Sequence, residues 1–486
     1  MRKLLLAGVA TFGASAAMLG LASAQNSPPA SPQMNSLQGT IATPASPGGD
    51  VFGDNNANSG TMTKGPIANP TPGTMVIRLG VRVFVNVSGN WSNLNQVGTD
   101  KLYPQQFGEY MRLYPGVDAM ATNGLRYGAA VELRQNWASP TGTTAANGGT
   151  GYTSTQTIFV RRAFAYVAGD SWGIVRFGEA DGLIGIYDNG GQTTGVYLSP
   201  TGTIVGGDLQ NMGVGNAYMS PFFGAQSGNE YGNTKIVYLS PNLSGFDFGF
   251  QYAPNPFNGY AIGSGLCASA AGDAACPNLS STPTLGIGSR TMNQYAVGAR
   301  YSGVVGGVGI LAYGVYMGSG TVNYTGGAAA AAATGPAGNT YNGKFDGLSL
   351  GSIGVNINYA GFAVFGNTLF GSVNGTLAAK PQNAVNAVGW VAGVRYVTGP
   401  WGIGALYGTY DSQGAQQLTG VTQRHENIFY AAGTYAVAPG MTAYLDYVYG
   451  TRYQGEFNFA TGGVGGGSAF NHVQAQGVML GTSIKW

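Results

Sequence analysis

The sequence predicts an all-β protein, a transmembrane antiparallel β-barrel of about 16 strands with short periplasmic turns and long extracellular loops. Its 486 residues include 84 glycines, and 12% are aromatic but only 8% charged, against roughly 25% charged and about 7% Gly in ordinary soluble domains. Beyond residue 24 no apolar run reaches the roughly 18 residues that a membrane-spanning helix needs. Instead, alternating apolar and polar segments recur along the chain, joined by connections that are short and long in turn. These three observations favour a barrel wall.

The first 24 residues have the pattern of a cleaved secretory signal. Arg2 and Lys3 precede an apolar stretch, and Ala22-Ser23-Ala24 supplies the small residues of a cleavage site. Removing this signal lowers the 21 basic residues to 19, equal to the 19 acidic residues. A balanced chain has no global electrostatic attraction to nucleic acid, so any selectivity depends on where the charges lie.

Residues 25–73 are rich in Pro, Gly, Ser and Asn and hold apolar residues only singly, which predicts a flexible periplasmic leader. From Thr74 the pattern changes, and residues 74–486 are predicted to form the outer-membrane barrel. Seven consecutive odd positions from Met75 to Val87 are apolar, whereas polar residues and Gly fall mostly between them. This period of two sends one set to lipid and the other to water.

Sixteen such segments follow one another. We expect strands near residues 74–88, 107–121, 124–137, 156–169, 172–179, 233–241, 244–254, 290–303, 306–317, 348–360, 361–374, 386–398, 401–411, 424–437, 441–452 and 472–486. Two-residue turns such as Thr122-Asn123 and Asp170-Ser171 alternate strictly with long loops, and an even strand number returns both barrel ends to the periplasmic side. The aromatic residues cluster near strand ends, as an interfacial girdle requires.

The last segment ends on an outward aromatic residue. Leu480, Ile484 and the terminal Trp486 are separated by even steps, so they share one face of the strand. This end resembles the C-terminal signature that hands outer-membrane barrels to the assembly machinery.

Two hairpins resemble the Gram-negative general diffusion porins. The sequence NTKIVYLSPNLSGFDFGFQY at 233–252 is similar to the hairpin that follows the third loop in that family, and FAYVAGDSWGIVRFG at 164–178 to the hairpin that precedes it. The resemblance covers about residues 74–486. It implies a homotrimer in the outer membrane of a Gram-negative bacterium, in contact with lipid and lipopolysaccharide. It also implies that the third loop, here about residues 180–232, folds into the lumen and forms the constriction.

Sixteen strands enclose an aqueous channel, so the leading function is passive diffusion of small hydrophilic solutes and ions. The second hypothesis within transport is a solute-selective channel. Such a channel would have aromatic side chains along the pore for stacking with sugars, or a basic cluster for anions. A structural or adhesive barrel, whose long loops bind a partner, is the alternative outside transport.

Arginines on the polar face of the early strands are the candidate pore lining. Each lies at a position whose side chain is predicted to face the lumen. They are Arg78, Arg82, Arg112, Arg126, Arg134 and Arg161. For Arg161 the inward direction is ambiguous, because the next residue, Arg162, would then face outward. Balancing carboxylates are expected opposite them, at or within the third loop that the family resemblance places in the lumen: Glu179, Asp181, Asp188 and Asp208.

Few residues favour any other chemistry. Cys267 and Cys276 are the only cysteines and are separated by eight residues in a secreted chain, which favours a loop-closing disulfide over redox or metal chemistry. His425 and His472 lie where loops meet strands, and Glu426 beside His425 points to the opposite face. We therefore expect no enzyme activity, no metal and no cofactor.

Overall fold

The computed structural model describes the barrel wall and the ends of several loops. The described residues are 70–94, 96–97, 100–101, 104–135, 158–187, 234–254, 293–323, 344–374, 379–380, 382–414, 422–459, 463–464 and 470–485. The predicted signal, nearly all of the predicted leader, both cysteines and Trp486 lie outside them.

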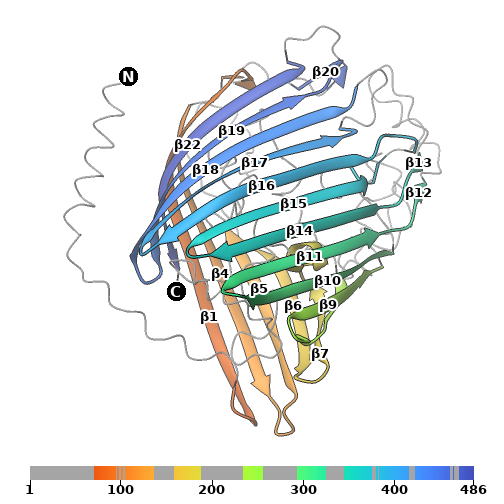
Figure 1. The fold of residues 1–486 in the computed structure, drawn as a ribbon, viewed down its shortest axis with the longest axis vertical. Helices are drawn as coiled ribbons and strands as arrows, with labels where there is room; N and C mark the ends of the chain where they lie inside the picture. Colours follow the sequence, from red (N-terminus) through yellow and green to blue (C-terminus); the bar gives the residue numbers. More distant parts are fainter. Residues whose placement is uncertain are drawn as a thin grey trace, which may run out of the picture. The chain divides into compact units, whose positions relative to one another are not determined.

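Sixteen antiparallel strands close into one barrel in the described part of the chain (Figure 1). They are β1 (Thr74–Ser92), β4 (Gln105–Met120), β5 (Arg126–Gln135), β6 (Ile158–Gly169), β7 (Gly173–Glu179), β8 (Thr234–Leu239), β9 (Phe246–Ala253), β10 (Gln294–Val305), β11 (Val308–Gly318), β14 (Ser349–Tyr359), β15 (Phe362–Ser372), β16 (Ala387–Thr398), β17 (Trp401–Ser412), β18 (Arg424–Ala438), β19 (Met441–Tyr453) and β22 (His472–Lys485). The predicted fold class is confirmed, because each of these strands falls on one predicted segment.

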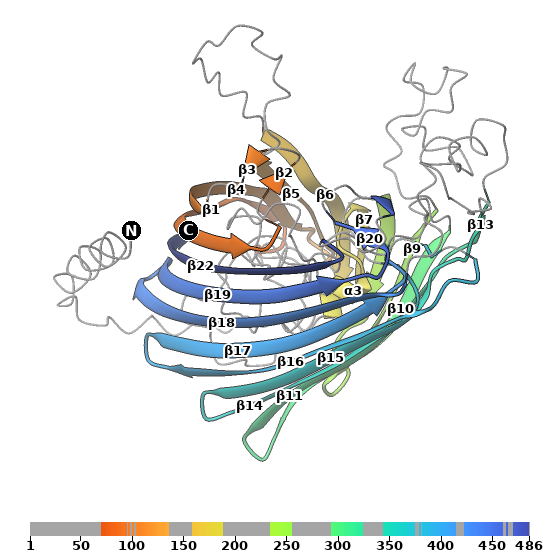
Figure 2. The same cartoon turned by 90° about the horizontal axis from the view of Figure 1, so that it is seen from above.

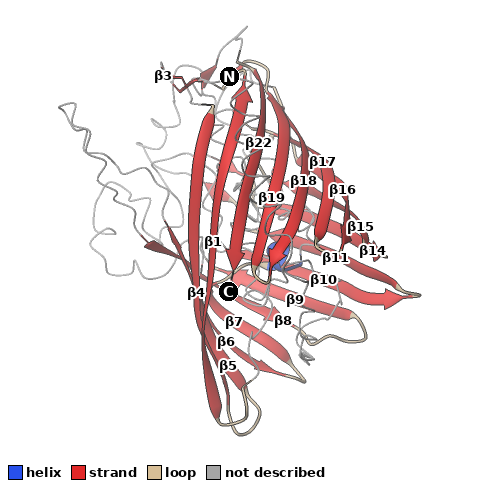
Figure 3. Cartoon of the chain, turned by 90° about the vertical axis from the view of Figure 1, so that its left-hand side faces the viewer, coloured by secondary structure: helices blue, strands red, loops and turns tan. Residues whose placement is uncertain are grey.

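Closure comes from β1, which pairs with β4 on one side and with β22 on the other (Figure 3). Thr74 lies opposite Met120 and Val87 lies opposite Leu480, so the two ends of the sequence complete the wall. A closed barrel leaves no strand edge without hydrogen bonds, which the hydrocarbon core of a membrane requires.

The alternation of residues separates the two faces of the wall. In β9, Phe246 is 57% exposed on the outside, whereas the next residue, Asp247, is 4% exposed and faces inward. The outward positions of β22 include Leu480 and Ile484, as the parity of that strand predicts. Apolar side chains therefore cover the membrane face of the wall and polar ones collect inside.

Aromatic pairs lie at both ends of the outer face. Phe362 packs on Tyr396 with ring centroids 4.3 Å apart, and Trp401 packs on Tyr435 at 4.5 Å, both beside the short turns. Trp390 and Tyr407 pair at 5.7 Å near the ends that carry the long loops. Aromatic rings favour the membrane–water interface, so these two bands mark the edges of the hydrocarbon layer.

The short turns are tight. Gly306 and Gly307 connect β10 to β11 with φ angles of 57° and 84°, a conformation that L side chains rarely adopt. The predicted short connections thus lie together at one end of the barrel, where β1 begins and β22 ends.

The remaining elements are small. They are the two-residue strands β2 (Gln96–Val97), β3 (Asp100–Lys101), β12 (Val322–Asn323), β13 (Lys344–Phe345), β20 (Phe457–Asn458) and β21 (Gly463–Val464), and the short helix α3 (Leu183–Tyr187). The helix lies inside the ring of strands, against β9, β10 and β11 (Figure 2). Within the described residues, no helix is long and apolar enough to cross a membrane.

Candidate functional site

A row of arginines crosses the inner face of three neighbouring strands. Arg82 on β1 lies directly opposite Arg112 on β4, which lies opposite Arg134 on β5. Cross-strand neighbours in antiparallel sheets have Cβ atoms only about 5 Å apart. The strand register therefore brings together side chains that are 30 and 22 residues apart in the sequence, and Arg82 and Arg112 are both buried.

A single carboxylate lies at the centre of this basic group. Glu132 is 0% exposed, and its oxygens accept hydrogen bonds from Arg134 Nε at 2.7 Å, Arg161 Nη1 at 3.0 Å and Arg112 Nη1 at 3.3 Å. Arg162 forms a fourth ion pair with Glu132 Oε2. We call Glu132 and these four arginines the arginine cluster. Glu132 was not among the predicted lining residues, although its position two residues before Arg134 places it on the same inner face.

A β-bulge explains why two consecutive arginines both face inward. The pairing of β5 with β6 shifts between Glu132 and Leu133: Glu132 lies opposite Arg162, whereas Leu133 lies opposite Val160. Arg161 is the extra residue of this bulge, because the strand pairing passes from Arg162 directly to Val160. A regular strand would point Arg161 and Arg162 to opposite faces, but a bulge re-aims side chains locally.

The third loop begins beside the same cluster. Asp181 accepts from Arg162 Nη2 at 2.8 Å and pairs with Arg162 Nε at 2.8 Å. Asp181 therefore lies on the same wall as the arginines and not across the lumen from them. Glu179 is partly exposed at the end of β7 and lies on the same face of the strand as Phe177, which points outward. A role of Glu179 in the constriction stays a prediction.

The other predicted lining residues are more scattered. Arg126 lies near the short-turn end of β5, where its Nη2 is 3.1 Å from the exposed Asp170. Arg78 is part of β1, but its side chain is not among those that the structure describes. Asp188 and Asp208 lie outside the described residues.

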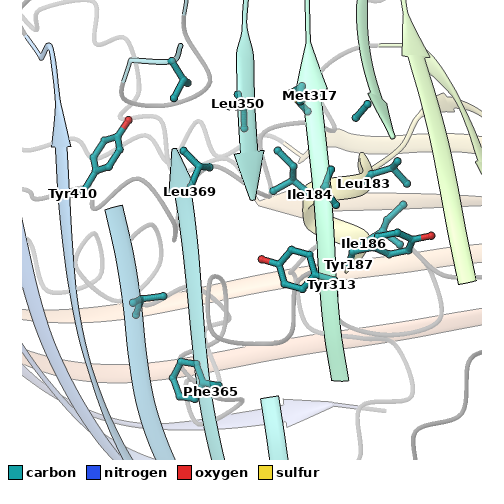
Figure 4. Close-up of a cluster of buried hydrophobic side chains, with 14 of the residues drawn as sticks. Leu183, Ile184, Ile186, Tyr187, Tyr313, Met317, Leu350, Phe365, Leu369 and Tyr410 are labelled. Carbon is teal, nitrogen blue, oxygen red and sulfur yellow. The ribbon is translucent and has the colours of Figure 1, made fainter. Parts of the chain in front are cut away.

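Helix α3 carries the third loop from β7 to the inner face of β9, β10 and β11. Leu183, Ile184, Ile186 and Tyr187 are buried and lie near Tyr313 of β11 (Figure 4).

Polar contacts hold this segment in place. The backbone N–H of Leu183 donates to Gln251 Oε1 at 2.6 Å. The Arg300 guanidinium lies 4.9 Å from the Tyr187 ring centroid and is paired with Asp247 at 2.8 Å. Burial raises the pKa of Tyr187, so its hydroxyl stays neutral.

The comparisons with known proteins agree with this geometry. The family described as Gram-negative porin matches residues 83–455, which is more than half of the chain. The chain belongs to the Gram-negative porin family. A porin is an outer-membrane channel for diffusion, and the sixteen-stranded wall observed here is wide enough to hold water. The predicted function as a diffusion porin is therefore confirmed at the level of the family.

Several solved porin structures are similar to the chain at low sequence identity. An anion-selective porin from Comamonas acidovorans is 14% identical, with a TM-score of 0.50, over 85% of this chain and 100% of that chain. OmpT of Vibrio cholerae in its trimer form is 11% identical, with a TM-score of 0.45, over 85% and 99%. A mutant porin of Rh. blastica is 12% identical, with a TM-score of 0.43, over 85% and 100%. No curated protein matches the chain.

Two glycines of this porin make room for the helix in its lumen. A Cβ atom on Gly249 of β9 would lie 2.6 Å from Leu183 Cδ2 and 2.9 Å from the Tyr187 hydroxyl. A Cβ on Gly298 of β10 would lie 3.1 Å from Tyr187 Cδ2. Inward-facing glycines thus fix how closely α3 approaches the wall.

Replacing Gly249 with valine is expected to displace α3 from the wall of the porin. Overpacking of this kind costs roughly 1–3 kcal/mol, and single-channel conductance should change because the third loop moves within the lumen. Gly314→Val is the matched control, since no described atom lies within 4 Å of a Cβ built on Gly314 of β11. Equal conductance in both variants and in the unmodified porin would contradict this role of Gly249.

His425 and its neighbour Glu426 each contact a charged side chain on an adjacent strand. His425 Nδ1 lies 2.7 Å from Asp411 Oδ1 on the exposed outer rim. Glu426 faces inward and accepts from Arg452 Nε at 2.5 Å. His425 and Glu426 therefore point to opposite faces, as their adjacency predicts. Among the described residues, no group of three or more His, Cys, Asp or Glu could hold a metal ion.

Proposed function

We propose that this porin passes small hydrophilic solutes and ions with a preference for anions, and that the arginine cluster produces the preference. The observation that carries the proposal is an excess of guanidinium groups over carboxylates on one inner wall. In the described part of β1, β4 to β7 and the start of the third loop, the inward arginines are Arg82, Arg112, Arg126, Arg134, Arg161, Arg162 and Arg176, against Asp118, Glu132 and Asp181.

The charges are placed where a permeating ion would experience them. Arginine keeps its charge at any physiological pH, and the Debye length is about 8 Å at physiological ionic strength. Glu132 cancels one charge of the cluster, but it pairs with four guanidinium groups at once. The remaining positive field favours anions over cations in the adjacent water.

Reconstitution of the purified porin in a planar bilayer tests this proposal. In a tenfold KCl gradient, the reversal potential should have the sign of chloride preference. It should shrink as the overall salt concentration is raised, because salt screens the arginines. A reversal potential of the sign of potassium preference would overturn the proposal.

The remaining assignments extend the family resemblance. We infer that the protein acts as a channel rather than an enzyme, that residues 1–24 are removed on secretion, and that the C-terminal residues Leu480, Ile484 and Trp486 engage the barrel assembly machinery. A homotrimer is proposed because one similar structure, OmpT of Vibrio cholerae, is described in a trimer form. Lipid and lipopolysaccharide would contact the apolar outer face.

A further inference from the structure

The outer face of the wall has a shallow apolar groove over β10, β11, β14, β15 and β16, which lie side by side in the barrel (Figure 1). Two adjoining hollows form it, of about 640 Å³ and about 630 Å³, and both are lined by Ala299, Gly314 and Ile353. The first hollow extends to Tyr316, towards the long loops, and the second to Val355, further down the wall. Ligand pockets in proteins measure roughly 300–1,000 Å³, so the groove has room for a ligand.

Small residues form the floor of the groove. Ala299 lies opposite Gly314 in one outward row, and Ala312 and Gly366 lie in the next row down. No described atom lies within 4 Å of a Cβ built on Gly314. Only a carbonyl oxygen, at 3.8 Å, comes as close to a Cβ built on Gly366. The space above these two glycines is therefore open to the outside.

Larger side chains surround this floor. Ile353 and Val355 on β14 are 52% and 40% exposed, and Trp390 on β16 is 45% exposed. Towards the long loops, the Phe370 ring covers Gly351, where a Cβ would lie 2.8 Å from a ring atom. The groove is therefore a local gap among bulky outward side chains.

The length of the groove matches one leaflet of a bilayer. A strand rises about 3.4 Å per residue, so the stretch of β14 from Ser349 to Val355 is about 20 Å long. Strands of membrane barrels tilt by about 40°, and this stretch therefore covers roughly 15 Å of an apolar band about 25 Å tall. Because Ser349 begins β14 at the long-loop end, the groove runs from the extracellular interface to about the middle of the hydrocarbon layer.

The extracellular end of the groove is polar but uncharged. The hydroxyls of Tyr316 and Ser349 are hydrogen-bonded to each other at 3.0 Å, and the ring centroids of Tyr295 and Tyr316 are 6.2 Å apart. Among the described residues that line the groove, no outward side chain carries a charge. The groove therefore complements an uncharged chain with an ester at its upper end. It offers no cation to an excess of negative charge, which favours a zwitterionic phospholipid over the anionic lipopolysaccharide.

Contact area decides what such a groove retains within a membrane. Lipid chains are as apolar as the wall, so van der Waals packing replaces the hydrophobic effect as the driving force. A chain in a groove touches protein beside it as well as beneath it, and each added contact contributes dispersion energy. A second copy of this chain would cover both leaflets and not the extracellular half alone, because its strands span the whole apolar band.

We propose that the groove binds one acyl chain of a phospholipid in the extracellular leaflet. The chain would lie on Ala299, Gly314 and Ala312, and its glycerol ester would lie beside the Tyr316 and Ser349 hydroxyls. The groove is on the outside of the channel, so this inference is independent of the proposed anion preference.

Native mass spectrometry of the purified porin tests the proposal, with phosphatidylethanolamine as the probe. In detergent, the unmodified porin should retain one lipid per chain. Gly314→Phe places a ring on the floor of the groove without a steric conflict in the wall, and should weaken retention at least fivefold. Gly433→Phe is the matched control, because Gly433 of β18 also faces outward into open space but lies outside the groove. This control should retain the lipid.

A second variant changes the groove without adding bulk. Ile353→Ala removes part of its side on β14 and should weaken retention at least threefold, which keeps the proposal testable should Gly314→Phe fail to fold. The conductance and the reversal potential of both variants should equal those of the unmodified porin, because the groove does not face the channel.

The other outcomes would overturn the inference. Equal retention in the unmodified porin, Gly314→Phe and Ile353→Ala would do so, as would a loss in Gly433→Phe as large as that in Gly314→Phe. Displacement of the phospholipid by an equal amount of purified lipopolysaccharide would overturn the choice of lipid. A smaller oligomer in Gly314→Phe would show that a second copy of the chain occupies the groove. None of these results bears on the proposed function, which the reversal potential of the unmodified porin decides.

Discussion

Replacing Arg82 and Arg112 together with glutamate is expected to shift the reversal potential in a KCl gradient towards potassium preference. The two residues are direct cross-strand partners on the inner wall, so the double change alters the charge at one level of the channel by four units. The shift should be large at about 0.1 M salt and small at about 1 M, where the Debye length falls to about 3 Å.

Two further variants sharpen this test. Arg126→Glu should have a smaller effect, because Arg126 lies towards the periplasmic end and is partnered by the exposed Asp170. Changing Arg82 and Arg112 to serine should give about half of the shift and keeps the test usable should the glutamate pair impair folding. An unchanged reversal potential in a folded double variant would exclude these arginines from the selective part of the channel.

Glu132→Gln is expected to have the largest effect on stability. The amide would leave four guanidinium groups facing one another without the carboxylate that joins them. Breaking a buried ion pair in this way costs about 3–5 kcal/mol, which should lower the midpoint of urea unfolding of the barrel in lipid vesicles. Any correctly folded fraction should show a stronger chloride preference, because one negative charge is lost from the wall.

Glu426→Gln is the comparison variant. In the unmodified porin, the Glu426 carboxylate on β18 pairs with Arg452. This variant should destabilise less, because the carboxylate contacts fewer arginines. Glu132→Asp retains the charge and should recover part of the lost stability. An unfolding midpoint equal to that of the unmodified porin in Glu132→Gln would show that the arginine cluster does not depend on its central carboxylate.

The sequence by itself determined the wall of this porin. Alternation at period two marks each strand and both of its faces, and the turn residues mark where the strands reverse. These signals are local, since each is contained within about ten consecutive residues. For the same reason, the inward parity of Arg82, Arg112, Arg126 and Arg134 could be predicted without any knowledge of the strands that would pair.

Only the tertiary structure decided how the inner residues meet. The bulge that turns both Arg161 and Arg162 inward depends on the pairing of β5 with β6. Glu132 becomes the centre of the arginine cluster because three strands place their arginines around it. The path of the third loop brings Asp181 to the arginine side of the lumen and α3 to β9, β10 and β11. Each of these contacts joins residues distant in the sequence, and strand register and loop path arise only when the wall has closed.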